Sequence, residues 1–284
     1  MSPTKLVENS EWSTFAPAFM QMVSAGPGTA PAQHMATHAD KLLPFSQATT
    51  VLDMGCGPGQ VTEAVLAQHG ARLPAEARVV GADNNTQMLQ GYAARKEKEI
   101  SQGKEHWKRA ETVQTDVHDC AAFADGSASH ILAGFLVFLV PEPEKALQAM
   151  KRVLKPGGVL ALSAWQESEW MDFMYYPKKV RPDLVMPVPP ADWTMPESVR
   201  TKLEQAGFKY IEVIQTEGYM PFEDYAEICR FMLTKMPLAA RAVTQMTDEE
   251  VLRTHELMVK DIKARHPTVP AKMVGKATIA YCRK

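Results

Sequence analysis

The stretch that decides the fold is Val51 to Thr62, which reads V-L-D-M-G-C-G-P-G-Q-V-T. An apolar strand ends in an acid, Asp53, and runs directly into a turn with glycines at Gly55, Gly57 and Gly59. Glycine tolerates positive φ and lets the backbone approach a ligand closely, and the start of the next helix attracts negative charge. The pattern therefore predicts a nucleotide-like cofactor at the junction of strand and helix.

The glycine spacing distinguishes two kinds of cofactor loop. The dinucleotide fingerprint is G-x-G-x-x-G, and its third glycine would fall at Gln60. A nicotinamide-dependent oxidoreductase would share the sheet, but the glutamine breaks its pattern. This class is therefore disfavoured.

Two further acids follow apolar strands downstream of the loop. Asp83 ends a second strand that begins at Arg78, and a carboxylate there can accept both hydroxyls of a ribose. Alternatively, Asp83 caps the helix that begins near Thr86. Asp116 follows a third strand and can accept an adenine amine, while its neighbour Val117 can pack on the ring.

The next segments complete an alternating pattern of strands and helices. A fourth strand runs from Ile131 into Gly134 and Phe135, and Leu154 to Gly158 form a turn that opens a fifth strand, Val159 to Ser163. This order predicts an α/β fold with a parallel, doubly wound sheet. Its ligand should lie at the carboxyl ends of the strands.

Residues 45 to 165 resemble the class I S-adenosylmethionine-dependent methyltransferases motif by motif. The resemblance implies S-adenosylmethionine as cofactor and S-adenosylhomocysteine as product. It places the glycine loop at the methionine part of the cofactor, Asp83 at the ribose, Asp116 at the adenine and the fourth strand at the amino acid end. The implied cofactor-binding residues are Asp53, Gly55, Cys56, Gly57, Gly59, Asp83, Asn84, Met88, Asp116, Val117, Gly134 and Phe135. A catalytic nucleophile at Cys56 is the alternative to a small buried side chain there.

Residues 1–44 precede the first strand and are expected to form an N-terminal helical lid. A helical stretch from Trp12 to Val23 carries Phe15 and other aromatics at helical spacing. These side chains either pack the helix onto the domain or fold over the cofactor, whose sulfonium cation attracts aromatic faces.

The carboxyl-terminal part predicts two more strands, Phe208 to Thr216 and Ala277 to Cys282. The resemblance implies that they pair antiparallel and complete a seven-stranded Rossmann-like sheet. The cofactor-binding core is then 45–216, residues 217–272 form a helical cap, and 273–284 return to the core as its last strand. A 56-residue insertion is too long for a hairpin loop.

Aromatic side chains crowd the segment after the fifth strand and offer walls for an acceptor pocket, although core packing of the cap explains them equally well. The pocket candidates are Trp12, Phe15, Trp165, Trp170, Tyr175 and Tyr176. A poor nucleophile would need a base, for which His118 and Glu169 are candidates. The layout resembles fungal natural-product methyltransferases such as the gliotoxin bis-thiomethyltransferase, which implies a small thiol, phenol or amine as acceptor. A methyltransferase-like regulator without turnover is the alternative.

Composition excludes several other classes of function. The 284 residues carry a formal net charge of −2 with no block of Lys or Arg, so neither nucleic acid nor a membrane surface is expected as a partner. The four cysteines have no metal-ligand spacing, and no metal is expected. The N-terminus lacks an apolar stretch, so we expect a cytoplasmic protein, a monomer or homodimer.

Overall fold

The computed structural model describes residues 9–22 and 26–284, which form a seven-stranded sheet in the order β3-β2-β1-β4-β5-β7-β6. The first five strands run parallel, and β7 pairs antiparallel with both β5 and β6. Their bounds are β1 Thr50–Met54, β2 Arg78–Asp83, β3 Ala110–Gln114, β4 Ala128–Ala133, β5 Leu154–Ser168, β6 Lys209–Phe222 and β7 Ala271–Arg283. The expected Rossmann-like sheet, with its antiparallel last pair, is confirmed.

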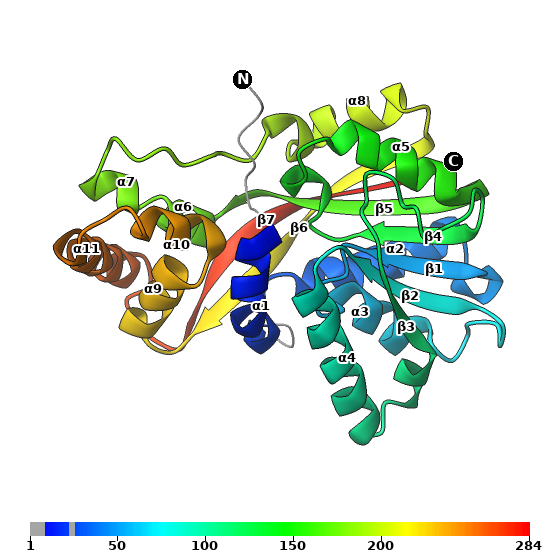
Figure 1. Ribbon diagram of the computed structural model, residues 1–284, viewed down its shortest axis with the longest axis horizontal. Helices are drawn as coiled ribbons and strands as arrows, with labels where there is room; N and C mark the ends of the chain where they lie inside the picture. Colours follow the sequence, from blue (N-terminus) through cyan, green and yellow to red (C-terminus); the bar gives the residue numbers. More distant parts are fainter. Residues whose placement is uncertain (1–8, 23–25) are drawn as a thin grey trace.

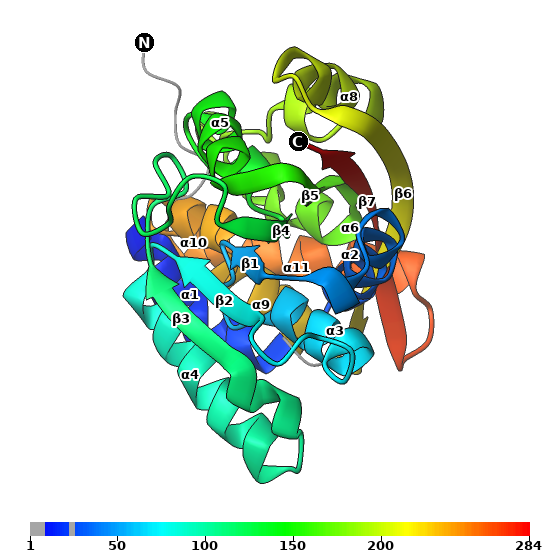
Figure 2. The same ribbon diagram turned by 90° about the vertical axis from the view of Figure 1, so that its right-hand side faces the viewer.

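Helices cover both faces of the sheet, as a doubly wound fold requires. Figure 2 shows α2 and α3 on one side of the sheet and α5 and α8 on the other. The helices outside the cap are α1 Asn9–Met22, α2 Thr29–Leu42, α3 Gln60–His69, α4 Thr86–Ser101, α5 Pro143–Val153 and α8 Pro196–Gln205. Single turns of 3-10 helix lie between several of these elements.

The remaining helices gather beyond one end of the sheet, where they form a cap (Figure 1). They are α6 Glu169–Met174, α7 Pro177–Val180, α9 Tyr225–Thr234, α10 Pro237–Val243 and α11 Asp248–Arg265. The insertion between β6 and β7 therefore supplies three of the cap helices, as expected, and the segment after β5 supplies the other two. Figure 1 shows α1 between this cap and α4.

Strands β6 and β7 are longer than the sequence indicated. Past the last pair of β5 with β7, at Gly275, they continue as a two-stranded antiparallel ribbon that runs from Gly218 opposite Gly275 to Phe222 opposite Ala271. Strand β6 continues through Pro221 because β6 is the edge strand of the sheet, where a missing backbone N–H is tolerated. The ribbon holds the cap helices at its far end.

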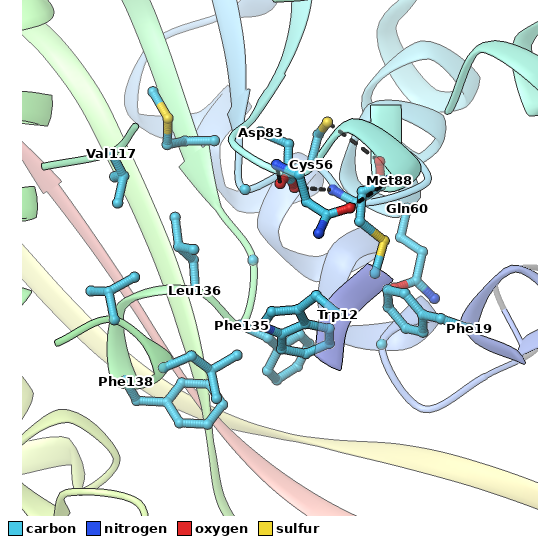
Figure 3. Close-up of a pocket in the computed structure, with 18 of the residues that line it drawn as sticks. Trp12, Phe19, Cys56, Gln60, Asp83, Met88, Val117, Phe135, Leu136 and Phe138 are labelled. Carbon is cyan, nitrogen blue, oxygen red and sulfur yellow. Dashed lines mark hydrogen bonds between the residues drawn. The ribbon is translucent and has the colours of Figure 1, made fainter. Parts of the chain in front are cut away.

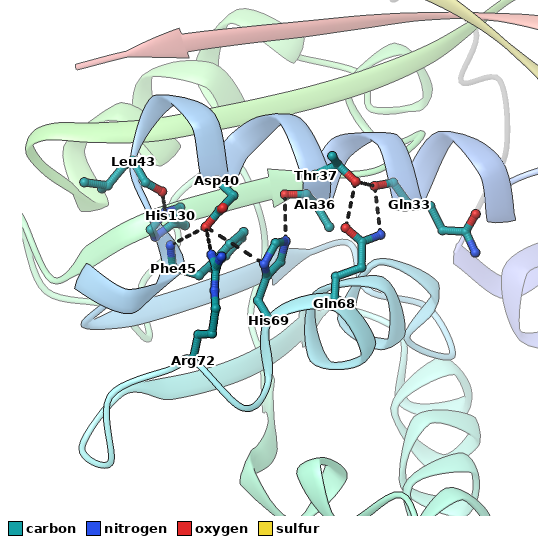
Figure 4. Close-up of polar contacts among 10 residues, drawn as sticks. All are labelled: Gln33, Ala36, Thr37, Asp40, Leu43, Phe45, Gln68, His69, Arg72 and His130. Atoms are coloured by element: carbon teal, nitrogen blue, oxygen red, sulfur yellow. Dashed lines mark hydrogen bonds and ion pairs between the residues drawn. The ribbon is translucent and has the colours of Figure 1, made fainter.

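A polar and aromatic cluster fixes α2 against α3 and β4 (Figure 4). The ring of Phe45 stacks between the imidazoles of His69 and His130, with centroid distances of 4.6 and 4.5 Å. Asp40 accepts hydrogen bonds from the Phe45 amide and from Arg72. The cluster connects the segment before β1 to the sheet and lies apart from the carboxyl ends of the strands.

The division of the chain into a lid, a core and a cap at residues 44, 216 and 272 stays a prediction. Residues 1–8 and 23–25 of the expected lid lie outside the described residues.

Candidate functional site

The glycine loop follows β1 as the sequence predicts. Gly55 and Gly57 have φ of +69° and +49°, and the Gly55 amide donates to the Ala82 carbonyl at 2.7 Å. A Cβ at Gly57 would lie 3.3 Å from the ring of Phe19, a close contact with the helix that faces the loop. Both backbone conformation and space therefore require glycine here.

Asp53 holds the start of α3 rather than pointing freely into solvent. Its Oδ2 atom accepts hydrogen bonds from the amide and the hydroxyl of Thr62, at 2.8 and 2.7 Å. Burial raises the pKa of this carboxyl to about 7, and the nearby Asp83 adds to the shift. The site thus contains an acid that is partly protonated at neutral pH.

Asp83 stands at the end of β2 and fastens the glycine loop. Its Oδ2 accepts from the Gly57 amide and its Oδ1 from the Asn85 amide, both at 2.9 Å. The helix cap is Asn85, whose side chain accepts from the amide of Met88, so the capping alternative for Asp83 is wrong. Burial raises the pKa of Asp83 as well, despite these hydrogen bonds.

Cys56 is buried in the loop, and burial raises the pKa of its thiol well above the usual value. The thiolate needed for nucleophilic attack is therefore scarce at neutral pH. The side chain acts as a small buried group, which was the alternative to a nucleophile.

Asp116 and His118 form a pair after β3. Asp116 Oδ1 lies 2.6 Å from Nδ1 of His118 and accepts from the His118 amide at 2.8 Å. Burial works to raise the pKa of Asp116, but the hydrogen bonds from His118 outweigh it and hold the pKa below its usual value. Among the described residues, the buried Nε2 of His118 has no hydrogen-bond partner.

These groups line a single cavity of about 920 Å³ at the carboxyl ends of the strands (Figure 3). Figure 3 shows Asp83, Cys56 and Met88 on one side and Phe135, Leu136 and Phe138 along the other wall. Small-molecule pockets span roughly 300–1,000 Å³, so the volume lies near the upper end of that range. The space accommodates a nucleotide-sized cofactor together with a second small molecule.

The cavity extends from the glycine loop to the cap, and its cap side is apolar. That side is lined by Trp165, Trp170, Met171, Met174, Pro189, Met220, Met236, Pro237 and Leu238. Helix α1 contributes Trp12, Phe15 and Phe19 to the same cavity. Elements far apart in sequence, from residue 12 to residue 238, therefore build one site.

Most of the expected site residues meet at this cavity. The expected cofactor and base residues found there are Asp53, Gly55, Cys56, Gly57, Asp83, Asn84, Met88, Asp116, Val117, His118, Gly134 and Phe135. Of the six expected pocket residues, four line the cavity: Trp12, Phe15, Trp165 and Trp170. Gly59 does not line it, because it is the amino-terminal cap of α3, where a Cβ would lie 2.9 Å from the ring of Tyr92.

Tyr175 and Tyr176 do not line the cavity, contrary to the sequence-based expectation. Their hydroxyls donate to the Pro187 carbonyl at 2.6 Å and to Asp261 at 2.7 Å. Both tyrosines therefore hold the cap together. The residues of α6 that face the cavity are Trp170, Met171 and Met174.

Glu169 also lies away from the cavity, so it has no place as a base there. Its carboxylate accepts from the amide of Val274 at 2.8 Å and lies 3.0 Å from Nε2 of His266. The side chain thus ties the start of α6 to β7 and to the end of α11.

Several lining residues carried no signal in the sequence. Met220, Met236 and Leu238 reach the site only because the β6–β7 ribbon carries the cap over the sheet. Asn85 was readable as a helix cap before Thr86, but not as a residue at the cavity.

Comparison with known proteins agrees with this geometry. A family model described as a methyltransferase domain matches residues 52–162. The chain is 29% identical over 271 residues to the methyltransferase ucsB of Acremonium sp., an alignment that covers 95% of this chain and 93% of that protein. It is 25% identical over 193 residues to the acetylaranotin bis-thiomethyltransferase of Aspergillus terreus, covering 64% and 63% of the two proteins.

The crystal structure of the YcgJ protein from Bacillus subtilis shares the fold, with a TM-score of 0.53 at 17% identity over 88% of this chain and 98% of that one. The class follows from the methyltransferase-domain match and the curated relatives, together with the glycine loop and the acids after β2 and β3. They identify a class I S-adenosylmethionine-dependent methyltransferase, and the shared fold agrees with this class.

The residues present fit S-adenosylmethionine. Positive-φ glycines leave room beside the loop, and a Cβ at Gly57 would fill part of it. Two desolvated carboxyls, Asp53 and Asp83, face the cavity where a positively charged ligand would favour their ionised forms.

Within the described residues, no group of three His, Cys, Asp or Glu side chains could hold a metal ion, and no helix has the length and apolar character needed to cross a membrane.

Proposed function

We propose that the enzyme methylates a small, apolar, natural-product-like acceptor through a thiol, phenol or amine, by in-line methyl transfer inside the cavity. The observation that carries this proposal is the continuity of the cavity. One side has the acids and glycines of the cofactor loop, and the other has the tryptophans, methionines and prolines of the cap. A cofactor on the first side leaves the apolar side for the acceptor.

Bound S-adenosylmethionine supplies a methyl group attached to a positively charged sulfur. The task of the protein is then to align the acceptor atom with that group and to exclude water, and such positioning accounts for roughly 7–11 kcal/mol of a barrier. Asp83 and the glycine loop would hold the cofactor, and Asn84, Met88, Asp116 and Val117 would contact its ribose and adenine. The cap side chains would exclude water from the acceptor.

An acceptor that loses its proton to solvent needs no base, which favours thiols and phenols, and a neutral amine also needs none. His118, oriented by Asp116 and lying at the cavity, is the residue available for a less acidic acceptor. The Aspergillus terreus relative is named as a bis-thiomethyltransferase, and this supports testing thiols first.

The test begins with calorimetric titration of the purified protein with S-adenosylmethionine and S-adenosylhomocysteine, with NAD as control. Micromolar binding of the first two alone is expected. A panel of small thiols, phenols, amines and aliphatic alcohols should then release S-adenosylhomocysteine with the first three classes. Turnover confined to aliphatic alcohols would contradict the proposed acceptor chemistry, and binding of NAD instead would contradict the cofactor side.

A further inference from the structure

The residue that joins the cofactor side to the acceptor side of the cavity is Phe135, and its backbone is unusual. It has a φ of +53°, in a region that aromatic residues seldom occupy. Its amide donates to both the carbonyl and the hydroxyl oxygen of Ser163, at 3.1 and 3.0 Å. Strained conformations of this kind persist where surrounding contacts fix them, and they concentrate at functional sites.

The ring of Phe135 begins a run of three aromatic side chains. It stacks on Trp165 of β5 with a centroid distance of 4.3 Å and an interplanar angle of 12°. Trp165 in turn meets Trp170 of α6 edge to face at 4.8 Å and 88°. All three line the cavity and form an aromatic wall from the end of β4 to the cap, in which Phe135 is partly exposed and the two buried indoles support its ring.

Two glycines of the β6–β7 ribbon make the space in which the tryptophans lie. Gly218 and Gly275 are register partners on the two strands. A Cβ at Gly218 would lie 2.3 Å from the Pro27 carbonyl oxygen and 2.5 Å from Cη2 of Trp165. A Cβ at Gly275 would lie 2.1 Å from Cη2 of Trp170 and 2.7 Å from Cβ of Ser168. Neither glycine has positive φ, so backbone conformation does not explain why glycine occupies these two positions. The absence of side chains lets the indoles lie close to the ribbon.

We propose that the wall of Phe135, Trp165 and Trp170 selects acceptors that carry a planar ring. Gly218 and Gly275 determine this specificity indirectly, because they hold the indoles back from the cavity. A flat ring stacks on another flat ring over its whole face, whereas a puckered ring of equal size does not. This inference rests on the proposed function, since the wall selects acceptors only if they bind in this cavity.

The test compares benzyl alcohol with cyclohexylmethanol, which differ in the planarity of one ring. Their dissociation constants are measured by ligand-observed NMR with the protein saturated in S-adenosylhomocysteine. Apolar area alone favours the saturated ring, so a preference of about threefold or more for benzyl alcohol reports stacking. Equal affinity, or tighter binding of cyclohexylmethanol, would overturn the proposal.

Substitutions then assign the preference to the wall. Phe135→Leu should reduce the preference to near unity, measured at S-adenosylhomocysteine concentrations that saturate each variant. Trp193→Phe is the matched control, because Trp193 is buried and does not line the cavity. An unchanged preference in Phe135→Leu would contradict the role of the wall.

The glycine pair needs its own variants. Gly275→Ala should weaken benzyl alcohol binding about fivefold or more by displacing Trp170. Adding Trp170→Phe removes the two closest ring atoms and leaves only the 2.7 Å contact with Cβ of Ser168, so it should restore most of the binding. Weak binding in both variants would contradict the spacing argument. If the unmodified enzyme does not bind S-adenosylhomocysteine, the proposed function itself is contradicted.

Discussion

At the scale of single residues, the site combines a buried carboxyl, Asp53, with a partly buried one, Asp83. The pKa of Asp53 is about 7 in the folded protein against its usual 3.8, because burial disfavours the charge and Asp83 repels it. The protonated form therefore stabilises the free protein, and this contribution is lost as the pH rises through 7. A bound cationic ligand would instead favour the ionised form of Asp53.

Cofactor affinity should accordingly depend on pH. The ammonium and sulfonium groups of S-adenosylmethionine favour the carboxylate, so below pH 7 binding must release a proton. We expect the dissociation constant to rise toward tenfold per pH unit below 7 and to level off above it. Calorimetry at pH 6 in two buffers of different ionisation enthalpy should show close to one proton released per ligand. Asp53→Asn should lose the dependence, and a flat profile in the unmodified enzyme would contradict the assignment.

Asp83 offers a sharper substitution than truncation to alanine. Alanine would leave the amides of Gly57 and Asn85 without their acceptor, which also disturbs the loop. Asp83→Asn keeps an acceptor for one of these amides but turns its NH2 group toward the other and removes the charge. S-adenosylhomocysteine affinity should therefore fall by about 10- to 100-fold, as expected for roughly 1.5–3 kcal/mol from a charged hydrogen bond. Thermal stability should fall less than in Asp83→Ala, which leaves both amides without an acceptor. Unchanged affinity in calorimetry would remove Asp83 from the cofactor site.

At the scale of elements, helix α1 is fastened on two sides. Asn85 donates its side-chain N–H groups to the Asn9 carbonyl, the Asn9 side chain and the Ser13 hydroxyl, at 2.8–2.9 Å. Glu11 forms an ion pair with Arg241 of α10, whose Nε lies 2.5 Å from Oε1. The helix thereby connects the cofactor loop to the cap, with Trp12, Phe15 and Phe19 at the cavity between them.

Loosening this connection should speed ligand release. Glu11→Gln removes the charge of a partly buried pair, and we expect S-adenosylhomocysteine to dissociate about fivefold faster in stopped-flow measurements, for roughly 1 kcal/mol of lost interaction. Exchange of the two charges, Glu11→Arg with Arg241→Glu, should recover much of the effect. Arg78→Gln breaks the exposed pair with Glu111 as a control. An equal dissociation rate in Glu11→Gln would leave α1 with a packing role only.

At the scale of the whole molecule, the cluster around Phe45 makes the fold sensitive to acid. His130 is fully buried, and burial lowers its pKa to about 4 from the usual 6.5. Its Nε2 donates to the Leu43 carbonyl at 2.8 Å, which works to raise the pKa, but burial outweighs this hydrogen bond and favours the neutral ring. Burial lowers the pKa of His69 too.

Because the folded pKa of His130 lies below the unfolded value, its contribution to stability is complete above pH 6.5 and is lost as the pH falls toward 4. The loss is about 3 kcal/mol for a shift of this size. Urea unfolding between pH 4 and 8 should show this decline, and His130→Gln should flatten it. An equally steep decline in the variant would assign the acid sensitivity to other groups.

Much of the cofactor side of the cavity could be predicted from the sequence, because it consists of short motifs next to single strands. The glycine loop, Asp83 and Asp116 each follow directly on a strand, and parallel strands bring their carboxyl ends to one edge of the sheet. The ends of β6 and β7 could not be read, since a proline is tolerated at an edge strand and only the pairing shows which strand is at the edge.

The sequence by itself determined the sheet, its cofactor and the class of reaction, because each depends on short motifs whose backbone geometry is set by neighbouring residues. The tertiary structure decided the acceptor side. Which face of α6 turns to the cavity, where Met220 and Leu238 come to lie, and why Tyr175 and Tyr176 point elsewhere all follow from packing between distant segments. Such contacts depend on the three-dimensional path of the β6–β7 ribbon, for which no local pattern exists.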